Sequence, residues 1–127
     1  MAMATALVVA LVAQAPATIV VQPAPEFEVG YVELLAGDDS RAIERIEANA
    51  SLPNDDPALL INKGVALARL GHIDEARESF EAAARGRHQM DLETTSGEWV
   101  DARSIARRAL VMLDGGTLAH DYALLMR

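Results

Sequence analysis

Apolar residues recur every three or four positions through much of the chain, and glycine and proline separate the runs in which they do so. This spacing is typical of amphipathic helices. It predicts a helix over residues 25–36, bounded by proline and glycine, and a second helix after capping residues at 38–40. After a loop at 51–57, the same signals predict a helix that ends at Gly71 and another that opens at Asp74.

The pattern changes in the last third of the chain. Apolar and polar residues alternate over 89–94, a turn follows at 95–97, and a short apolar stretch returns at 98–100. This arrangement predicts a small β-hairpin. Helical spacing then resumes from residue 102 to about residue 113, and residues 117–127 predict one last short helix.

The two helix pairs that precede the hairpin resemble each other. Proline, glycine and core residues of the first pair have counterparts 34 positions later in the second pair. A helix–turn–helix period of 34 residues is the signature of the tetratricopeptide repeat. The segment ALLINKGVALARLGHIDEARESFEAAAR, residues 58–85, resembles such a repeat at nearly every diagnostic position. Residues 27–49 resemble it less closely, since Glu33 and Asn49 stand where the family has an aromatic and a small residue.

The resemblance implies a mainly all-α fold, an α–α superhelix of two repeats at about 23–56 and 57–90, within a unit spanning 25–90. A general arrangement of four helices is the alternative. In the family, small residues allow helices to touch, large ones fill the space beside them, and glycines turn the chain. The positions carried over by the resemblance are Gly30, Gly37, Ala42, Ile46, Gly64, Leu67, Gly71, Ala76, Phe80 and Ala83.

A stack of only two repeats leaves apolar surface open at its end. We expect residues 91–127, the hairpin and the C-terminal helix, to cap that surface, with Trp99 as the anchor that closes the core. The alternative is that the open end forms a homodimer.

The first 24 residues have a different character. No charged side chain occurs in the first 21 positions, the apolar run is short, and small residues and prolines follow. This pattern predicts a secretory signal peptide and a linker outside the fold, and hence export to the periplasm of a Gram-negative cell. Small-x-small patterns place the cut after Ala15 or after Ala17, and a cut nearer Ala24 is a third option. The segment could instead be an uncleaved membrane anchor, or a buried strand or helix.

Charge and composition narrow the class of partner. The formal net charge is −8, and the nine acidic residues between positions 22 and 56 face only two arginines. An acidic chain is a poor partner for nucleic acid or an anionic membrane. The chain has no cysteine, which excludes disulfides and thiolate metal sites.

No pattern of catalytic, metal or cofactor residues stands out. The three histidines are not spaced as metal ligands, no serine lies in a nucleophile elbow, and no glycine spacing suits a phosphate. We therefore expect a protein that is not an enzyme, with no cofactor and no small-molecule substrate. One group of basic residues could pair within the chain or bind an acidic peptide: Arg85, Arg87, Arg103, Arg107 and Arg108.

The resemblance implies a binding module, since the first helix of each tetratricopeptide repeat lines a concave groove that holds a peptide or a protein segment. The groove residues implied by repeat position are Phe27, Tyr31, Leu34, Ile61, Asn62, Val65, Ala68 and Arg69. We expect a mostly apolar groove with an acidic rim, in a non-enzymatic interaction protein. The alternative is a structural subunit or small homodimer whose repeats serve self-assembly.

Overall fold

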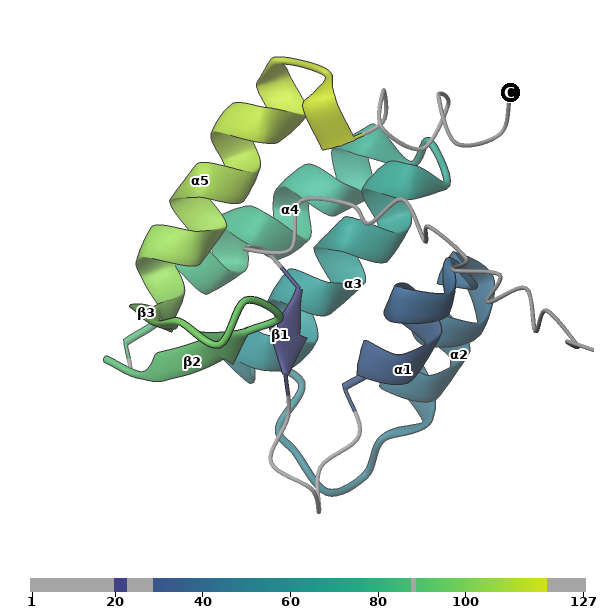
Figure 1. The fold of residues 1–127 in the computed structure, drawn as a ribbon, viewed down its shortest axis with the longest axis horizontal. Coiled ribbons are helices and arrows are strands. Elements are labelled where there is room, and N and C mark those ends of the chain that lie inside the picture. The colour runs from purple at the N-terminus through teal and green to yellow at the C-terminus, as the bar shows by residue number, and fades with distance from the viewer. Residues whose placement is uncertain (1–19, 23–28, 88, 119–127) are drawn as a thin grey trace, which may run out of the picture.

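The computed structural model describes residues 20–22, 29–87 and 89–118, and this part of the chain is mainly helical (Figure 1). It contains five helices and a small three-stranded antiparallel sheet whose strands lie in the order β1-β2-β3. In chain order, the elements are β1 (Val21–Gln22), α1 (Tyr31–Ala36), α2 (Asp39–Ala48), α3 (Pro57–Arg69), α4 (Ile73–Ala84), β2 (Asp91–Thr94), β3 (Trp99–Asp101) and α5 (Ala102–Asp114).

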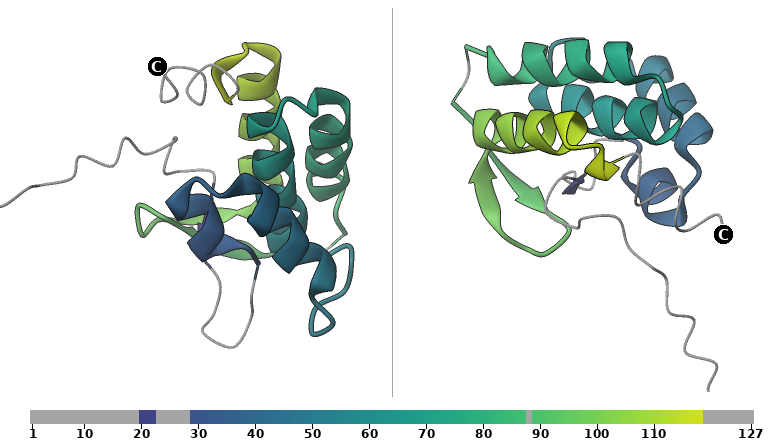
Figure 2. Two further views of the ribbon diagram at one scale, coloured as in Figure 1. Left: turned by 90° about the vertical axis from the view of Figure 1, so that its right-hand side faces the viewer. Right: turned by 90° about the horizontal axis from the view of Figure 1, so that it is seen from above.

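Helix α3 lies at the centre of the fold. It packs against α4 along its length and also contacts α2, α5, α1 and β1. The sheet lies on the side of α3 and α5 that faces away from α4 (Figure 2). Strand β1 contacts α3, the helix that carries most of the expected groove residues. Whether those residues are exposed therefore depends on what β1 covers.

Three helices begin where the sequence predicts, at aspartates that accept backbone hydrogen bonds. Asp38 accepts a hydrogen bond from the N–H of Arg41 at 3.2 Å, and Asp56 accepts one from the N–H of Ala58 at 2.9 Å, directly before the proline that opens α3. Asp101 caps α5 in the same way. Helix α4 begins at Ile73, one residue earlier than expected, and its cap residue makes no side-chain hydrogen bond.

Helix α1 is shorter than predicted, because Gly30 interrupts it. We expected a helix over 25–36 with Gly30 inside, but Gly30 has φ of +71° and stands before the first helical residue, Tyr31. Residues 25–28 lie outside the described part of the chain. The predicted close approach at Gly30 is nevertheless present, since a β-carbon there would be 3.1 Å from the carbonyl oxygen of Ala42.

Of the other positions that the resemblance singled out as structural, Gly37 and Gly71 are exposed in turns with φ of +75° and +84°, and the rest lie in the core. Ala42, Ala76 and Phe80 are completely buried, and the core also includes Ile46, Leu67 and Ala83. Gly64 on α3 faces the ring of Phe80 on α4.

The predicted hairpin is present, but the role expected for Trp99 is wrong. Strands β2 and β3 pair antiparallel, with Leu92 opposite Val100 and Glu93 opposite Trp99. Successive side chains of a strand point to opposite faces of the sheet. Val100 is half-buried, and the neighbouring Trp99 therefore lies on the other face. Trp99 is 68% exposed and does not anchor the core.

Helix α5 has the two faces expected of a terminal helix. Its apolar face packs on α4 and α3, and its other face carries the exposed Arg107 and Arg108 together with the exposed Val111. The buried residues of α5 are Ala102, Ile105, Ala106, Ala109 and Leu113. Most of the last predicted helix, residues 117–127, lies outside the described residues.

The segment expected to be a linker contributes to the fold. Val20 and Val21 are 3% and 0% exposed, and β1 pairs with β2. The prediction that all of residues 1–24 lie outside the fold is therefore corrected for residues 20–22, because β2 offers an edge on which they form a third strand. Among the described residues, no helix is long and apolar enough to cross a bilayer.

Candidate functional site

Most of the described residues that the resemblance assigned to a groove are buried, so they do not form an open surface. Four of them, all on α3, have no exposed area: Ile61, Asn62, Val65 and Ala68. On α1, Leu34 is 2% exposed and Tyr31 is half-buried, and Arg69 at the end of α3 is 8% exposed. Phe27 lies outside the described residues. The expectation of a solvent-exposed apolar groove is thus corrected.

Asn62 shows what covers this face of α3. Its Oδ1 accepts a hydrogen bond from the N–H of Val21 at 2.8 Å. Its Nδ2 donates to the carbonyl oxygens of Val21 and Val29, both at 3.0 Å. The side-chain amide thus pairs with both backbone groups of one residue of β1. Because these contacts go to backbone atoms, they hold an extended chain without selecting its side chain.

The opposite edge of β1 is held by the hairpin. Val21 lies opposite Thr94 and Gln22 opposite Glu93 in the antiparallel register. The N–H of Thr95 also donates to the carbonyl oxygen of Val20 at 3.2 Å. Since backbone groups of successive strand residues point to opposite edges, Val20 reaches the hairpin while Val21 reaches Asn62. Strand β1 is therefore held between Asn62 of α3 on one edge and strand β2 on the other.

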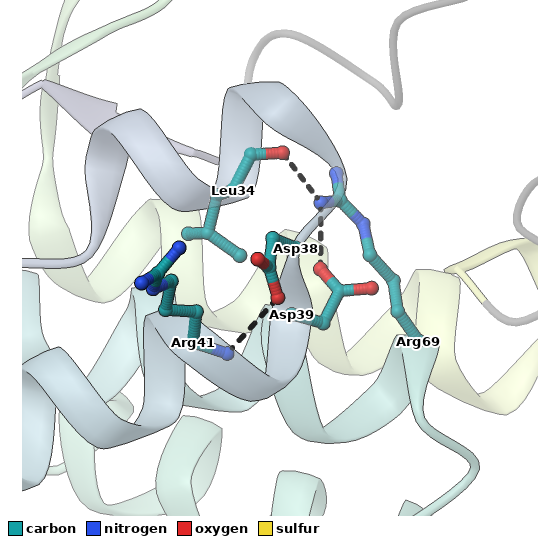
Figure 3. Close-up of polar contacts among 5 residues, drawn as sticks. All are labelled: Leu34, Asp38, Asp39, Arg41 and Arg69. Carbon is teal, nitrogen blue, oxygen red and sulfur yellow. Dashed lines mark hydrogen bonds and ion pairs between the residues drawn. The ribbon is translucent and has the colours of Figure 1, made fainter.

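Arg69, the basic residue expected in the groove, is engaged within the protein. Its Nη1 donates to the carbonyl oxygen of Leu34 at 3.1 Å and pairs with Oδ1 of Asp39 at 3.2 Å (Figure 3). Both side chains are buried, at 7% exposure for Arg69 and 1% for Asp39. The pair links α3 to the end of α1 and the start of α2. Arg69 is therefore a buried link between helices.

The environment of Asp39 is electrostatically unusual. Burial raises the pKa of its carboxyl group above the ordinary value, and the neighbouring Arg69 charge opposes that rise. Its Oδ2 has no hydrogen-bond partner among the described residues. The carboxylate is thus compensated by a single arginine, which makes this ion pair sensitive to substitution.

Two of the five basic residues that the sequence grouped together make ion pairs with acids close by. Arg85 pairs with Glu81 at 3.8 Å, and Arg103 pairs with Asp101 at 3.4 Å. For these two arginines, the contacts agree with the interpretation that the group pairs within the chain.

Two small surface hollows flank Leu60 at the start of α3. One lies against α2 and has a volume of about 310 Å³, and the other lies against the end of α4 and has a volume of about 240 Å³. These volumes are at or below the lower end of the range for small-molecule sites.

Groups suited to metal binding were also sought in the described ranges 20–22, 29–87 and 89–118. No group of three or more histidine and acidic side chains there could hold a metal ion. His72 is half-exposed in the turn before α4, where its Nδ1 lies 3.5 Å from Glu75.

Comparison of the chain with protein-family models, with curated proteins and with solved structures found no match. The likeness to tetratricopeptide repeats therefore rests on the residues quoted from the sequence and carries no family assignment.

Proposed function

We propose that this chain is a non-enzymatic protein-interaction module, built on a tetratricopeptide-like scaffold, that binds an extended protein segment on the α3 face now occupied by β1. The observation that supports this most is the pairing of the buried Asn62 amide with both backbone groups of Val21. A buried asparagine on a helix is costly unless its amide is hydrogen-bonded, and here an extended backbone supplies the bonds.

The occupant of this face is short enough to be exchanged. Strand β1 has two residues, and it is held through backbone contacts that any extended segment without proline at the bonded position could make. A partner segment has to compete with β1, which belongs to the same chain and is therefore present at a high effective concentration. Binding is therefore expected to be weak unless β1 is displaced or the partner makes further contacts.

The chemistry of the site indicates the kind of segment that fits. Val21 is completely buried, so the central residue of a ligand should be apolar and of about the size of valine. A charged residue there would be excluded, because it would lose its hydration without a partner. We further propose that this module acts in the cell envelope, on the basis of the apolar, uncharged N-terminal segment.

Self-assembly is the second candidate function, and the same strand supports it. If β1 of one copy paired with Asn62 of another, a dimer would form by exchange of an identical element with no new kind of contact. Light scattering coupled to size-exclusion chromatography separates the two candidates, since exchange predicts a dimer and the interaction module predicts a monomer.

A peptide with the sequence of residues 18–24, TIVVQPA, labelled with a fluorophore, tests the binding function. Val21→Asp should release β1 from its buried position, and the released face should then bind the peptide and raise its anisotropy. Val21→Asp combined with Asn62→Ala should bind much more weakly. Val111→Asp, at a residue that is 72% exposed, is the matched control and should bind no better than the unchanged chain. A folded Val21→Asp chain that does not bind the peptide would count against the proposal.

A further inference from the structure

The position of β1 limits where a leader peptide can be removed from this chain. Residues 20–22 belong to the fold: Val20 and Val21 are core residues, and Val21 supplies both backbone groups that Asn62 binds. We propose that a leader peptidase of the exporting cell cuts between Ala17 and Thr18, so that the mature chain keeps β1. This inference rests on the export that forms part of the proposed function.

A cut near Ala24 conflicts with the described structure. It would remove residues 20–22, and Asn62 would lose its hydrogen bonds to Val21 at the centre of the fold. The edge of β2 would lose the partners of Thr94 and Glu93, and the N–H of Thr95 would lose its acceptor on Val20. Buried polar groups left without partners destabilise a fold, so a product that begins at Pro25 is not the expected mature protein.

The two remaining small-x-small patterns differ in the residue that follows the cut. A cut after Ala15 places Pro16 directly after the scissile bond, where proline has no N–H and a fixed φ, which makes it a poor residue there. A cut after Ala17 has alanine at both specificity positions, Ala15 and Ala17, and a threonine next. Only this option combines an acceptable cut with an intact β1.

The chemistry is hydrolysis of one peptide bond. Water adds across the bond between the Ala17 carbonyl carbon and the Thr18 nitrogen, which leaves a carboxylate on Ala17 and an α-amino group on Thr18. The new amino group stands two residues before Val20, so the mature chain begins almost at β1. The uncharged apolar segment leaves with the leader.

Intact mass and N-terminal sequencing test the assignment directly. The full chain with a C-terminal affinity tag is expressed in a Gram-negative host and purified from the periplasmic fraction. The expected product begins at Thr18. Ala17→Arg should block the cut and accumulate precursor, whereas Ala24→Arg, the matched control, should leave the Thr18 N-terminus unchanged.

Two contrary outcomes would overturn the assignment and can be told apart. A periplasmic product that begins at Pro16 or Pro25 would overturn the cut site alone. Uncleaved chain in the cytoplasm would overturn both the cut and export, yet it would leave the peptide-binding test unaffected. The proposal assumes that β1 stabilises the fold. A chain that begins at Pro25 should therefore melt at a lower temperature than one that begins at Thr18. Equal melting temperatures would overturn the reason for excluding a cut near Ala24.

Discussion

Gly64 of α3 lies directly against the aromatic ring of Phe80 on α4. A β-carbon placed on Gly64 would stand 2.5 Å from Cε1 of Phe80 and 2.7 Å from its Cδ1, closer than real β-carbons approach other atoms. The two helices therefore pack as closely as they do because one side chain is absent and the ring takes its space. Since Phe80 is completely buried, any movement of the ring has to displace other core side chains.

Gly64→Ala is expected to destabilise the fold by about 1–3 kcal/mol, the usual range for an overpacked core. Alanine favours a helix over glycine by about 1 kcal/mol, so a net loss would show that the contact with Phe80 dominates. Urea unfolding, monitored by circular dichroism, measures this change in the free energy of unfolding. Adding Phe80→Leu to Gly64→Ala should cost less than the two single changes together. A stabilised Gly64→Ala chain would contradict the packing described here.

This helical part of the fold could be predicted from the sequence because its determinants are local. The starts of α2, α3 and α5 follow from an aspartate close to the first apolar residues. The resemblance to the repeat implied that Gly64 lies at a close helix crossing and that Phe80 fills the core, and the two residues face each other. The hairpin was also predictable from alternation and a turn. Gly30 was placed inside a helix because spacing alone does not show that its backbone takes a positive φ.

Removing the charge of Arg69 should expose the cost of burying Asp39. Arg69→Met leaves the carboxylate without its only cation and is expected to destabilise the fold by about 3–5 kcal/mol at neutral pH. Asp39→Leu together with Arg69→Met should recover most of that loss, because an apolar pair needs no compensation. Denaturant unfolding of the two variants decides this. A double variant as unstable as Arg69→Met alone would contradict it.

The stability of the Arg69→Met chain should depend on pH in a defined direction. Burial raises the pKa of Asp39 in the folded chain above its ordinary value of 3.8, and Arg69 opposes that rise. The folded state therefore holds this proton more tightly than the unfolded state, so the stability contributed by Asp39 falls as pH rises through the folded pKa. In Arg69→Met the opposing charge is gone and the fall should be larger. The stability difference from the unchanged chain should be greater at neutral pH than near the ordinary pKa of 3.8, and equal differences would contradict the role of Asp39.

Trp99 should behave as a surface residue. It is the only tryptophan in the chain, so the fluorescence of the chain reports on this site alone. Its emission should resemble that of tryptophan in water, acrylamide should quench it efficiently, and Trp99→Ala should change stability by less than about 0.5 kcal/mol. Leu92→Ala, at a buried position of β2, should cost about 2 kcal/mol or more and serves as the comparison. A blue-shifted emission that shifts on unfolding would restore the anchor role.

The candidate site could be predicted only in part, because its partners are far apart in the sequence. Repeat position placed Asn62 on the groove face, but Val21 lies 41 residues away in a segment that resembles a leader and linker. In the sequence, Asp39 is one of several acidic residues at the start of a helix. Its partner Arg69 lies 30 residues later, and no local pattern predicts that they pair. Long-range pairings of this kind depend on how the elements pack, which neither spacing nor composition specifies.

The central claim is that Asn62 holds an extended backbone segment against α3, and amide hydrogen exchange at Val21 tests it most directly. The N–H of Val21 donates to Asn62 at 2.8 Å and should exchange slowly in the unchanged chain. In Asn62→Ala it should exchange much faster, while the amides of Ala66 and Leu67 in the middle of α3 stay protected. A Val21 amide that exchanges at the unprotected rate in the unchanged, folded chain would contradict the account.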